Sequence, residues 1–148
     1  MKANVSAYRE LIGVWSRESN TSLKPPLPAE CVQALLASHG FVATRDVVEL
    51  YSLVGGMPIN CPDDRMFELW CRERVDEENT GSTWEYLWFG DWLYGAHVYA
   101  LKPVDQFHSA VYIDHQCDRI TAPEVVAGSV YEFASRLLCD PSSVGITL

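Results

Sequence analysis

The sequence predicts a single α+β domain in which helices come first, strands follow and one helix closes the chain. Three observations support this prediction. Apolar residues before residue 54 recur at a spacing near 3.6, those between residues 66 and 121 alternate with a period near two, and residues 129–139 return to the helical spacing. With 148 residues the chain fits one domain, residues 1–148, and is long enough for one core.

Three helices are expected in the N-terminal part, near residues 4–17, 28–39 and 45–54. The first carries one apolar stripe, formed by Val5, Tyr8, Leu11, Ile12 and Trp15. Pro28 suits the first turn of the second helix, and Gly40 follows it as a cap. The third helix stops before the glycine pair 55–56.

Strands are expected next, because aromatic and β-branched residues dominate and the period falls towards two. The candidate strands are 66–71, 84–89, 97–101, 110–114 and a short segment at 119–121. Residues 76–82 are polar and contain Gly81, so they are expected to form a connection. This order of elements predicts an antiparallel sheet between residues 66 and 121.

The closing helix, residues 129–139, has the clearest signal. Ser129 and Glu132 have the spacing of a capping box, in which each side chain accepts a hydrogen bond from a backbone amide of the first turn. The apolar stripe behind the cap consists of Val130, Phe133, Ala134, Leu137 and Leu138.

Composition excludes some classes of protein. No run of 18 apolar residues is present, so no membrane-spanning helix is expected, and the start lacks the apolar stretch of a signal peptide. Five scattered cysteines without a C-x-x-C pair indicate reduced thiols rather than a disulfide framework. Together these features favour a cytosolic location.

The charge of the chain bears on its partners. The formal net charge is −9, with 20 acidic and 11 basic residues. Because the basic residues are dispersed, direct binding to nucleic acid is not expected. A protein partner with a basic surface would be favoured, since complementary charge guides encounter. The alternative is that the acidity only keeps the protein soluble.

Three segments in this order resemble the SUKH superfamily, which includes the yeast Smi/Knr-type cell-wall regulators and many bacterial toxin-immunity proteins. Residues 46–56 resemble its helix ending in a glycine turn, residues 89–101 its central hairpin with Gly-Asp, and residues 126–133 its closing helix. The similarity spans about residues 27–138. One departure is Trp92-Leu93-Tyr94, where many members have a small residue.

The resemblance implies a SUKH-like domain with a curved antiparallel sheet, flanked by the N-terminal helices and the C-terminal helix, whose concave face binds protein. It implies no catalytic residue. In bacteria such proteins commonly bind and neutralise a cognate toxin, often a nuclease. A second possibility is a regulatory scaffold like the yeast relatives, and the sequence does not decide whether the protein dimerises.

An enzymatic role has little support in the sequence, which contains no recognised nucleophile, phosphate-binding or metalloprotease motif. No cofactor and no metal site are therefore expected. A small metal-dependent hydrolase is the rival hypothesis, and it requires His115 and Cys117 to converge with His97 or His108.

The candidate partner-binding site combines aromatic and acidic residues between positions 61 and 91. If Leu87 and Phe89 face the core, Tyr86 and Trp88 face outward with Trp84; a fully structural role for these rings is the alternative. The acidic residues are expected to set the rate of encounter with the partner and the register of binding. The alternative is that they only form a solvated loop and solvated strand edges. The predicted site consists of Asp76, Glu77, Glu78, Trp84, Glu85, Tyr86, Trp88 and Asp91.

Overall fold

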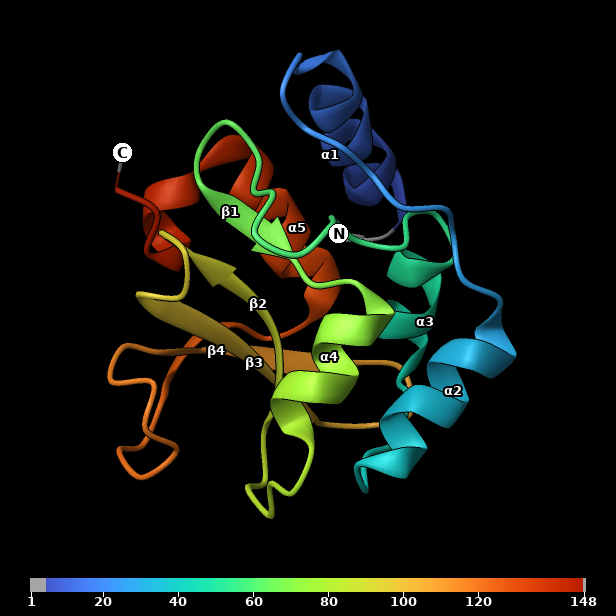
Figure 1. The fold of residues 1–148 in the computed structure, drawn as a ribbon, viewed down its shortest axis with the longest axis vertical. Helices are drawn as coiled ribbons and strands as arrows, with labels where there is room; N and C mark the ends of the chain where they lie inside the picture. Colours follow the sequence, from blue (N-terminus) through green and yellow to red (C-terminus); the bar gives the residue numbers. More distant parts are fainter. Residues whose placement is uncertain (1–4, 148) are drawn as a thin grey trace.

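The computed structural model describes residues 5–147 and confirms the α+β class (Figure 1). The elements are α1 (Val5–Arg17), α2 (Ala29–Ser38), α3 (Arg45–Tyr51), β1 (Phe67–Leu69), α4 (Arg72–Asn79), β2 (Leu87–Trp92), β3 (His97–Pro103), β4 (Ser109–Asp114), β5 (Glu124–Ala127), α5 (Val130–Cys139) and the 3-10 turn η1 (Pro141–Val144). The four predicted helices are confirmed to within three residues at each end, although residue 4 lies outside the described residues.

The strands form one open antiparallel sheet in the order β1-β2-β3-β4-β5, so each strand pairs with its neighbours in sequence. The register shifts between Trp88 and Gly90 and again between Val111 and Tyr112. Such bulges bend a strand and increase its twist, which curves the sheet.

The main core lies between this sheet and α5, with α1 packed against α5 (Figure 1). Phe133 of α5 is central to it. Its ring centroid lies 5.9 Å from that of Phe67, 5.9 Å from that of Phe89 and 5.0 Å from that of Tyr99, so one side chain joins three strands.

The predicted cap of α5 is confirmed, with one difference. The Ser129 hydroxyl accepts a hydrogen bond from the Glu132 amide at 3.0 Å. The Glu132 carboxylate accepts in return from the amide of Gly128, at 2.8 Å, one residue before the one expected for a capping box.

The prediction that residues 76–82 form a connection is partly wrong, because α4 extends to Asn79. The inward side of this helix offers few apolar residues, and Val75 is its buried one. Asn79 is also buried: its side chain donates to the carbonyls of Val75 and Trp88, at 2.8 Å each, and accepts from the Trp88 amide at 3.0 Å. These hydrogen bonds fasten the end of α4 to β2.

Two strand predictions are also corrected. The strand expected at 84–89 begins at Leu87 and runs on to Trp92. The segment 119–121 is not a strand, because the Asp118 carboxylate accepts from the amides of Ile120 and Thr121 and closes a turn. The strand in this region is β5, which follows that turn.

Candidate functional site

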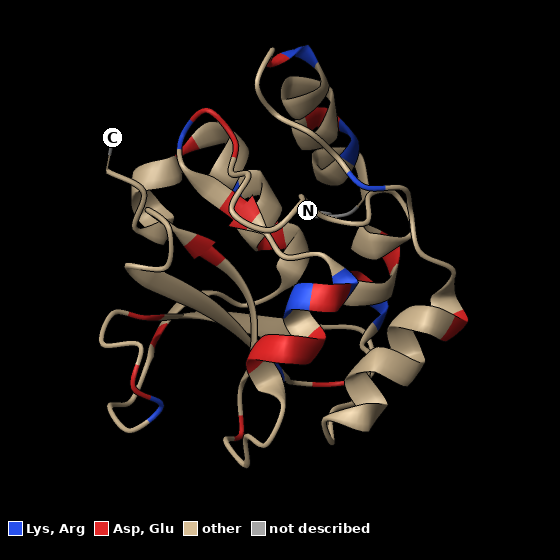
Figure 2. Ribbon diagram, in the orientation of Figure 1, with Lys and Arg blue, Asp and Glu red and all other residues tan. Residues whose placement is uncertain are grey.

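Three of the five acidic residues of the predicted site, Asp76, Glu77 and Glu78, lie near the end of α4. Asp76 and Glu77 are exposed and Glu78 is half-buried. Figure 2 shows acidic residues concentrated on this part of the helix. They face solvent because Val75 and Asn79, four residues apart, turn the opposite side of α4 towards β2.

Some of these carboxylates have basic neighbours. Asp76 lies 2.9 Å from the ring of His39, and Glu78 lies 3.8 Å from the guanidinium of Arg74. Within the described residues, Glu77 has no ion-pair partner. The basic side chain of each pair is largely buried, at 9% exposure for His39 and 11% for Arg74, whereas the carboxylates stay open to solvent.

The aromatic residues of the predicted site form a cluster on the sheet face opposite α5. The Trp84 and Tyr86 rings are half-buried, with centroids 4.6 Å apart. Tyr86 in turn lies edge-on to Tyr112 of β4, at 4.9 Å. Tyr112 is not among the predicted residues, although the alternation of Ala110–Asp114 places it and Ile113 on opposite faces of the sheet.

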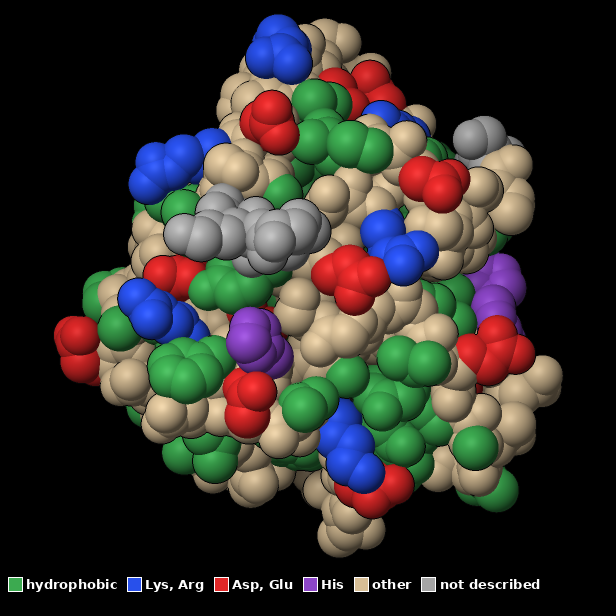
Figure 3. Space-filling view, turned by 180° about the vertical axis from the view of Figure 1, so that it is seen from behind, with side chains coloured by type: hydrophobic (Ala, Val, Ile, Leu, Met, Phe, Trp, Pro, Cys, Tyr) green, Lys and Arg blue, Asp and Glu red, His purple; other side chains and the backbone are tan. Residues whose placement is uncertain are grey.

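Polar and apolar side chains border this cluster. The Lys102 ammonium lies 5.3 Å from the centroid of the Tyr86 ring and 3.3 Å from the exposed carboxylate of Glu85. Val125 of β5 pairs with Tyr112 in register and is 61% exposed. Figure 3 shows hydrophobic side chains gathered on the lower part of the molecule beside one basic and one acidic side chain.

Trp88 is not exposed as predicted: it contacts Trp84 of the outer cluster, but it is covered and only 9% exposed. The guanidinium carbon of Arg119 lies 3.6 Å from the centroid of its ring, and Arg119 also donates to the Glu78 carbonyl at 2.5 Å. The loop after β4 therefore covers Trp88 and reaches the end of α4. Trp88 still supports the cluster, because the Trp84 ring lies edge-on to it at 6.4 Å.

Asp91 is buried as well, at 1% exposure, so its carboxylate does not lie on the surface, where the predicted contact with a partner would need it. It accepts a hydrogen bond from the Trp70 indole at 2.8 Å and lies 3.1 Å from the Arg74 guanidinium. Arg74 also donates to the buried carboxylate of Glu68 at 2.6 Å. Two carboxylates of neighbouring strands thus share one arginine of α4.

The remaining six predicted residues have exposed or half-buried side chains, on α4 and in the segment before β2, and we call them together the acidic–aromatic surface. It consists of Asp76, Glu77, Glu78, Trp84, Glu85 and Tyr86, with Tyr112 added by the structure. Arg119 links the two segments that carry these residues, because it donates to the backbone carbonyl of Glu78 and lies over the ring of Trp88, which contacts Trp84. Arg119 also had no local sequence signal, since it acts across 41 residues.

The two buried carboxylates that share Arg74 make the stability of the fold depend on pH. Burial is the main factor that raises the pKa of Glu68 and that of Asp91, while Arg74 opposes it. Unfolded carboxyl groups titrate at about 3.9–4.3. Because the pKa values are higher in the folded state, these groups favour folding at low pH, and this contribution is lost as the pH rises through the folded-state values.

We expect this contribution to be measurable with Asp91→Asn, whose side chain does not titrate. The free energy of unfolding of the wild type, minus that of the variant, should increase as the pH is lowered from neutrality towards about 4, the ordinary value for an unfolded aspartate. Urea denaturation at several pH values measures it. Glu77→Gln, which neutralises an exposed carboxylate, is the control and should give a flat difference; a flat difference for Asp91→Asn would contradict the prediction.

Only two of the four residues in the metal-dependent hydrolase hypothesis converge on each other. His97 and His115 do converge, with Nδ1 atoms 3.0 Å apart, and burial with the neighbouring His115 lowers the pKa of His97. The thiol of Cys117 instead bonds backbone carbonyls, and His108 lies against Asp105. All five cysteines are free, as predicted. Across residues 5–147 no group of three or more His, Cys, Asp or Glu side chains is placed to hold a metal ion.

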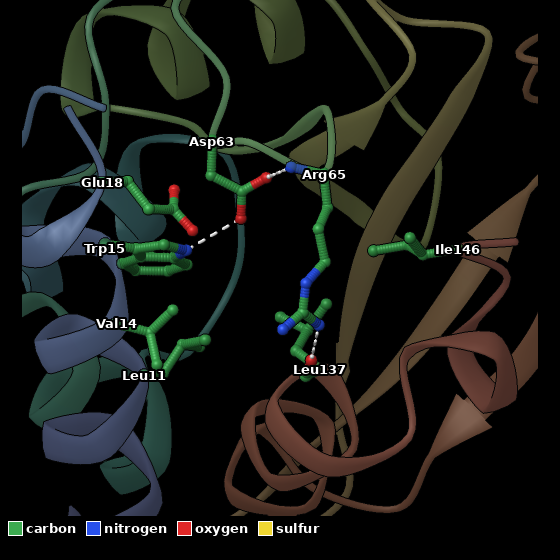
Figure 4. A pocket seen from close by; sticks show the side chains of 8 residues that line it. All are labelled: Leu11, Val14, Trp15, Glu18, Asp63, Arg65, Leu137 and Ile146. Carbon is green, nitrogen blue, oxygen red and sulfur yellow. Dashed lines mark hydrogen bonds between the residues drawn. The ribbon is translucent and has the colours of Figure 1, made fainter. Parts of the chain in front are cut away.

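A small cavity between α1, α5 and the segment before β1 is a packing feature (Figure 4). Its volume is about 10 Å³, which admits at most one water molecule. The Trp15 indole donates to Asp63 at 2.8 Å beside it, and Arg65 donates to the Leu137 carbonyl at 2.7 Å. These bonds tie α1 and α5 to the segment that leads into β1.

No helix in the described part of the chain has the length and apolar character that a bilayer span requires. Comparisons with known proteins find no family model, no curated protein and no solved structure that matches this chain.

Proposed function

We propose that the protein is a cytosolic, non-catalytic immunity protein of the SUKH kind, which binds a cognate toxin through the acidic–aromatic surface. The observation that carries the proposal is that α4 exposes carboxylates while the segment before β2 holds half-buried aromatic rings, and that Arg119 contacts both α4 and the Trp88 ring next to Trp84. The order of SUKH-like segments in the sequence supports the same class of function.

The two parts of the surface would act differently. Asp76 and Glu77, which are exposed, and the half-buried Glu78 form an acidic group on an acidic protein, and such a group raises the association rate with a basic partner. Trp84 and Tyr86 carry large rings that are already held by ring contacts, so little side-chain entropy is lost when a partner covers them.

Buried residues of the region would support the surface instead of touching the partner. Trp88 lies under Trp84, and Asp91 holds Arg74 of α4 in place. Glu85 stands at the rim, where its ion pair with Lys102 can reorganise.

A nuclease toxin fits this chemistry well. An enzyme that cleaves nucleic acid needs a basic groove for the phosphate backbone. A row of carboxylates on a helix can occupy that groove in place of phosphates, and the aromatic rings then exclude water from the contact. The protein itself needs no catalytic group for this role.

We expect the triple variant Asp76→Lys, Glu77→Lys and Glu78→Lys to bind the toxin encoded by the neighbouring gene more slowly. At low ionic strength its association rate constant should fall by about tenfold or more, and its dependence on salt should weaken. Surface plasmon resonance over a range of salt concentrations measures both effects.

The control carries the same charge change on three other exposed carboxylates, in Glu10→Lys, Glu30→Lys and Asp64→Lys. Equal slowing in both variants would mean that net charge acts without a defined surface. Tyr86→Ala should mainly speed dissociation, whereas Phe107→Ala, at an exposed aromatic of another loop, should not. If all four proteins bind the toxin alike, the proposed surface is wrong.

A further inference from the structure

Two histidines meet at the end of the sheet away from the acidic helix. His97 is the first residue of β3, and His115 directly follows β4. Since Val98 pairs with Asp114, the two histidines face each other across adjacent strands. Their Nδ1 atoms lie 3.0 Å apart, and the side chain of His115 is 42% exposed, so the pair is open to solvent.

We propose that this pair binds one divalent transition-metal ion, with Cu²⁺ preferred and Ni²⁺ next. Two nitrogens that are 3.0 Å apart and each about 2.0–2.1 Å from one ion subtend about 95° at that ion. Square-planar and octahedral ions need an angle near 90°, whereas tetrahedral Zn²⁺ would require the nitrogens to separate to about 3.4 Å. The order of divalent-metal affinities also favours Cu²⁺.

The surroundings of His97 hold its ring in this position. The ring stacks on the indole of Trp92, with centroids 5.3 Å apart and planes inclined by 26°. The indole is itself fixed, because Trp92 donates to the Arg65 carbonyl at 2.8 Å. Binding therefore requires little new ordering of this ligand.

A carboxylate beside His115 favours the tautomer that a metal ligand at Nδ1 needs. The Nε2 atom of His115 lies 3.6 Å from the Glu124 carboxylate, which favours the tautomer with hydrogen on Nε2 and a lone pair on Nδ1. In the metal-free protein His97 Nδ1–H then donates to that lone pair. The metal ion takes the place of this hydrogen, while His97 changes to the tautomer protonated on Nε2.

The site has two protein ligands, so water would fill the other coordination positions. Cys117 is close in sequence but is not a ligand here, because its thiol is bonded to the carbonyls of Gly95 and Asp114. This leaves an open, two-nitrogen site, which differs from the three-ligand hydrolase site considered above and does not depend on toxin binding.

Calorimetric titration of the untagged chain with CuCl₂ tests the proposal. We expect one equivalent to bind, with Ni²⁺ weaker than Cu²⁺ and Zn²⁺ weaker than Cu²⁺. His97→Gln and His115→Gln should each weaken binding by at least about tenfold. The matched control is His108→Gln, which removes another partly exposed histidine beside a carboxylate and should bind Cu²⁺ like the wild type.

Electron paramagnetic resonance of the Cu²⁺-loaded protein gives a second readout, since two imidazole nitrogens produce a characteristic splitting. His97→Gln and His115→Gln should each lose this splitting, and His108→Gln should keep it. Glu124→Gln should weaken Cu²⁺ binding by no more than about tenfold. This is the lower end of the loss in metal affinity that follows mutation of a residue that orients a metal ligand. The proposal is wrong if the wild type takes up no Cu²⁺. It is also wrong if binding survives intact in His97→Gln and His115→Gln, or depends on His108.

Discussion

Replacing Asp46 by alanine should lower the free energy of unfolding by about 3–5 kcal/mol, because several buried donors would lose their shared acceptor. The Asp46 carboxylate is fully buried. It accepts from the Thr44 hydroxyl at 2.6 Å and from the amides of Val47 at 2.9 Å, Ser109 at 3.0 Å and Val130 at 2.9 Å. One side chain thus joins the starts of α3, β4 and α5.

Urea denaturation measures this effect, with Asp64→Ala as the control. Asp64 is an exposed aspartate of a loop, and its replacement should change stability by no more than about 0.5 kcal/mol. An Asp46→Ala protein within about 1 kcal/mol of the wild type would mean that water or a shifted backbone satisfies the released donors.

Phe133→Ala should cost about 3–5 kcal/mol, the usual range for removing a fully packed aromatic ring. The ring is 2% exposed and touches aromatic side chains from three strands. Phe133→Leu, which retains much of the volume, should cost clearly less. Phe107→Ala, at a 44% exposed ring, is the control; equal melting temperatures for Phe133→Ala and Phe107→Ala would contradict the central place of Phe133 in the core.

The sequence predicted those elements whose signal is local. α1 and α5 each show an apolar stripe, and Ser129 with Glu132 marks the start of α5. The sequence did not predict α4, because few of its residues are apolar. One of the two buried residues of the helix is Asn79, a residue type that is typical of loops.

The positions of the site residues depended on contacts that sequence patterns do not reveal. The alternation of β2 predicts one buried and one exposed face, but α4 and the loop after β4 cover part of the second face. Trp88 is covered by Arg119, which lies 31 positions later in the chain, and Asp91 is paired with Arg74, which lies 17 positions earlier. The histidine pair likewise forms only through the register of β3 and β4.

The edges of the sheet restrict how a partner can attach. β1 at one edge has three residues, and β5 at the other has four, follows Pro123 and begins with the exposed Glu124. Short edges that carry proline and charge are poor templates for an added strand. We therefore expect neither a second copy of the chain nor a binding partner to extend the sheet by main-chain hydrogen bonding, so recognition would rest on side chains across its face.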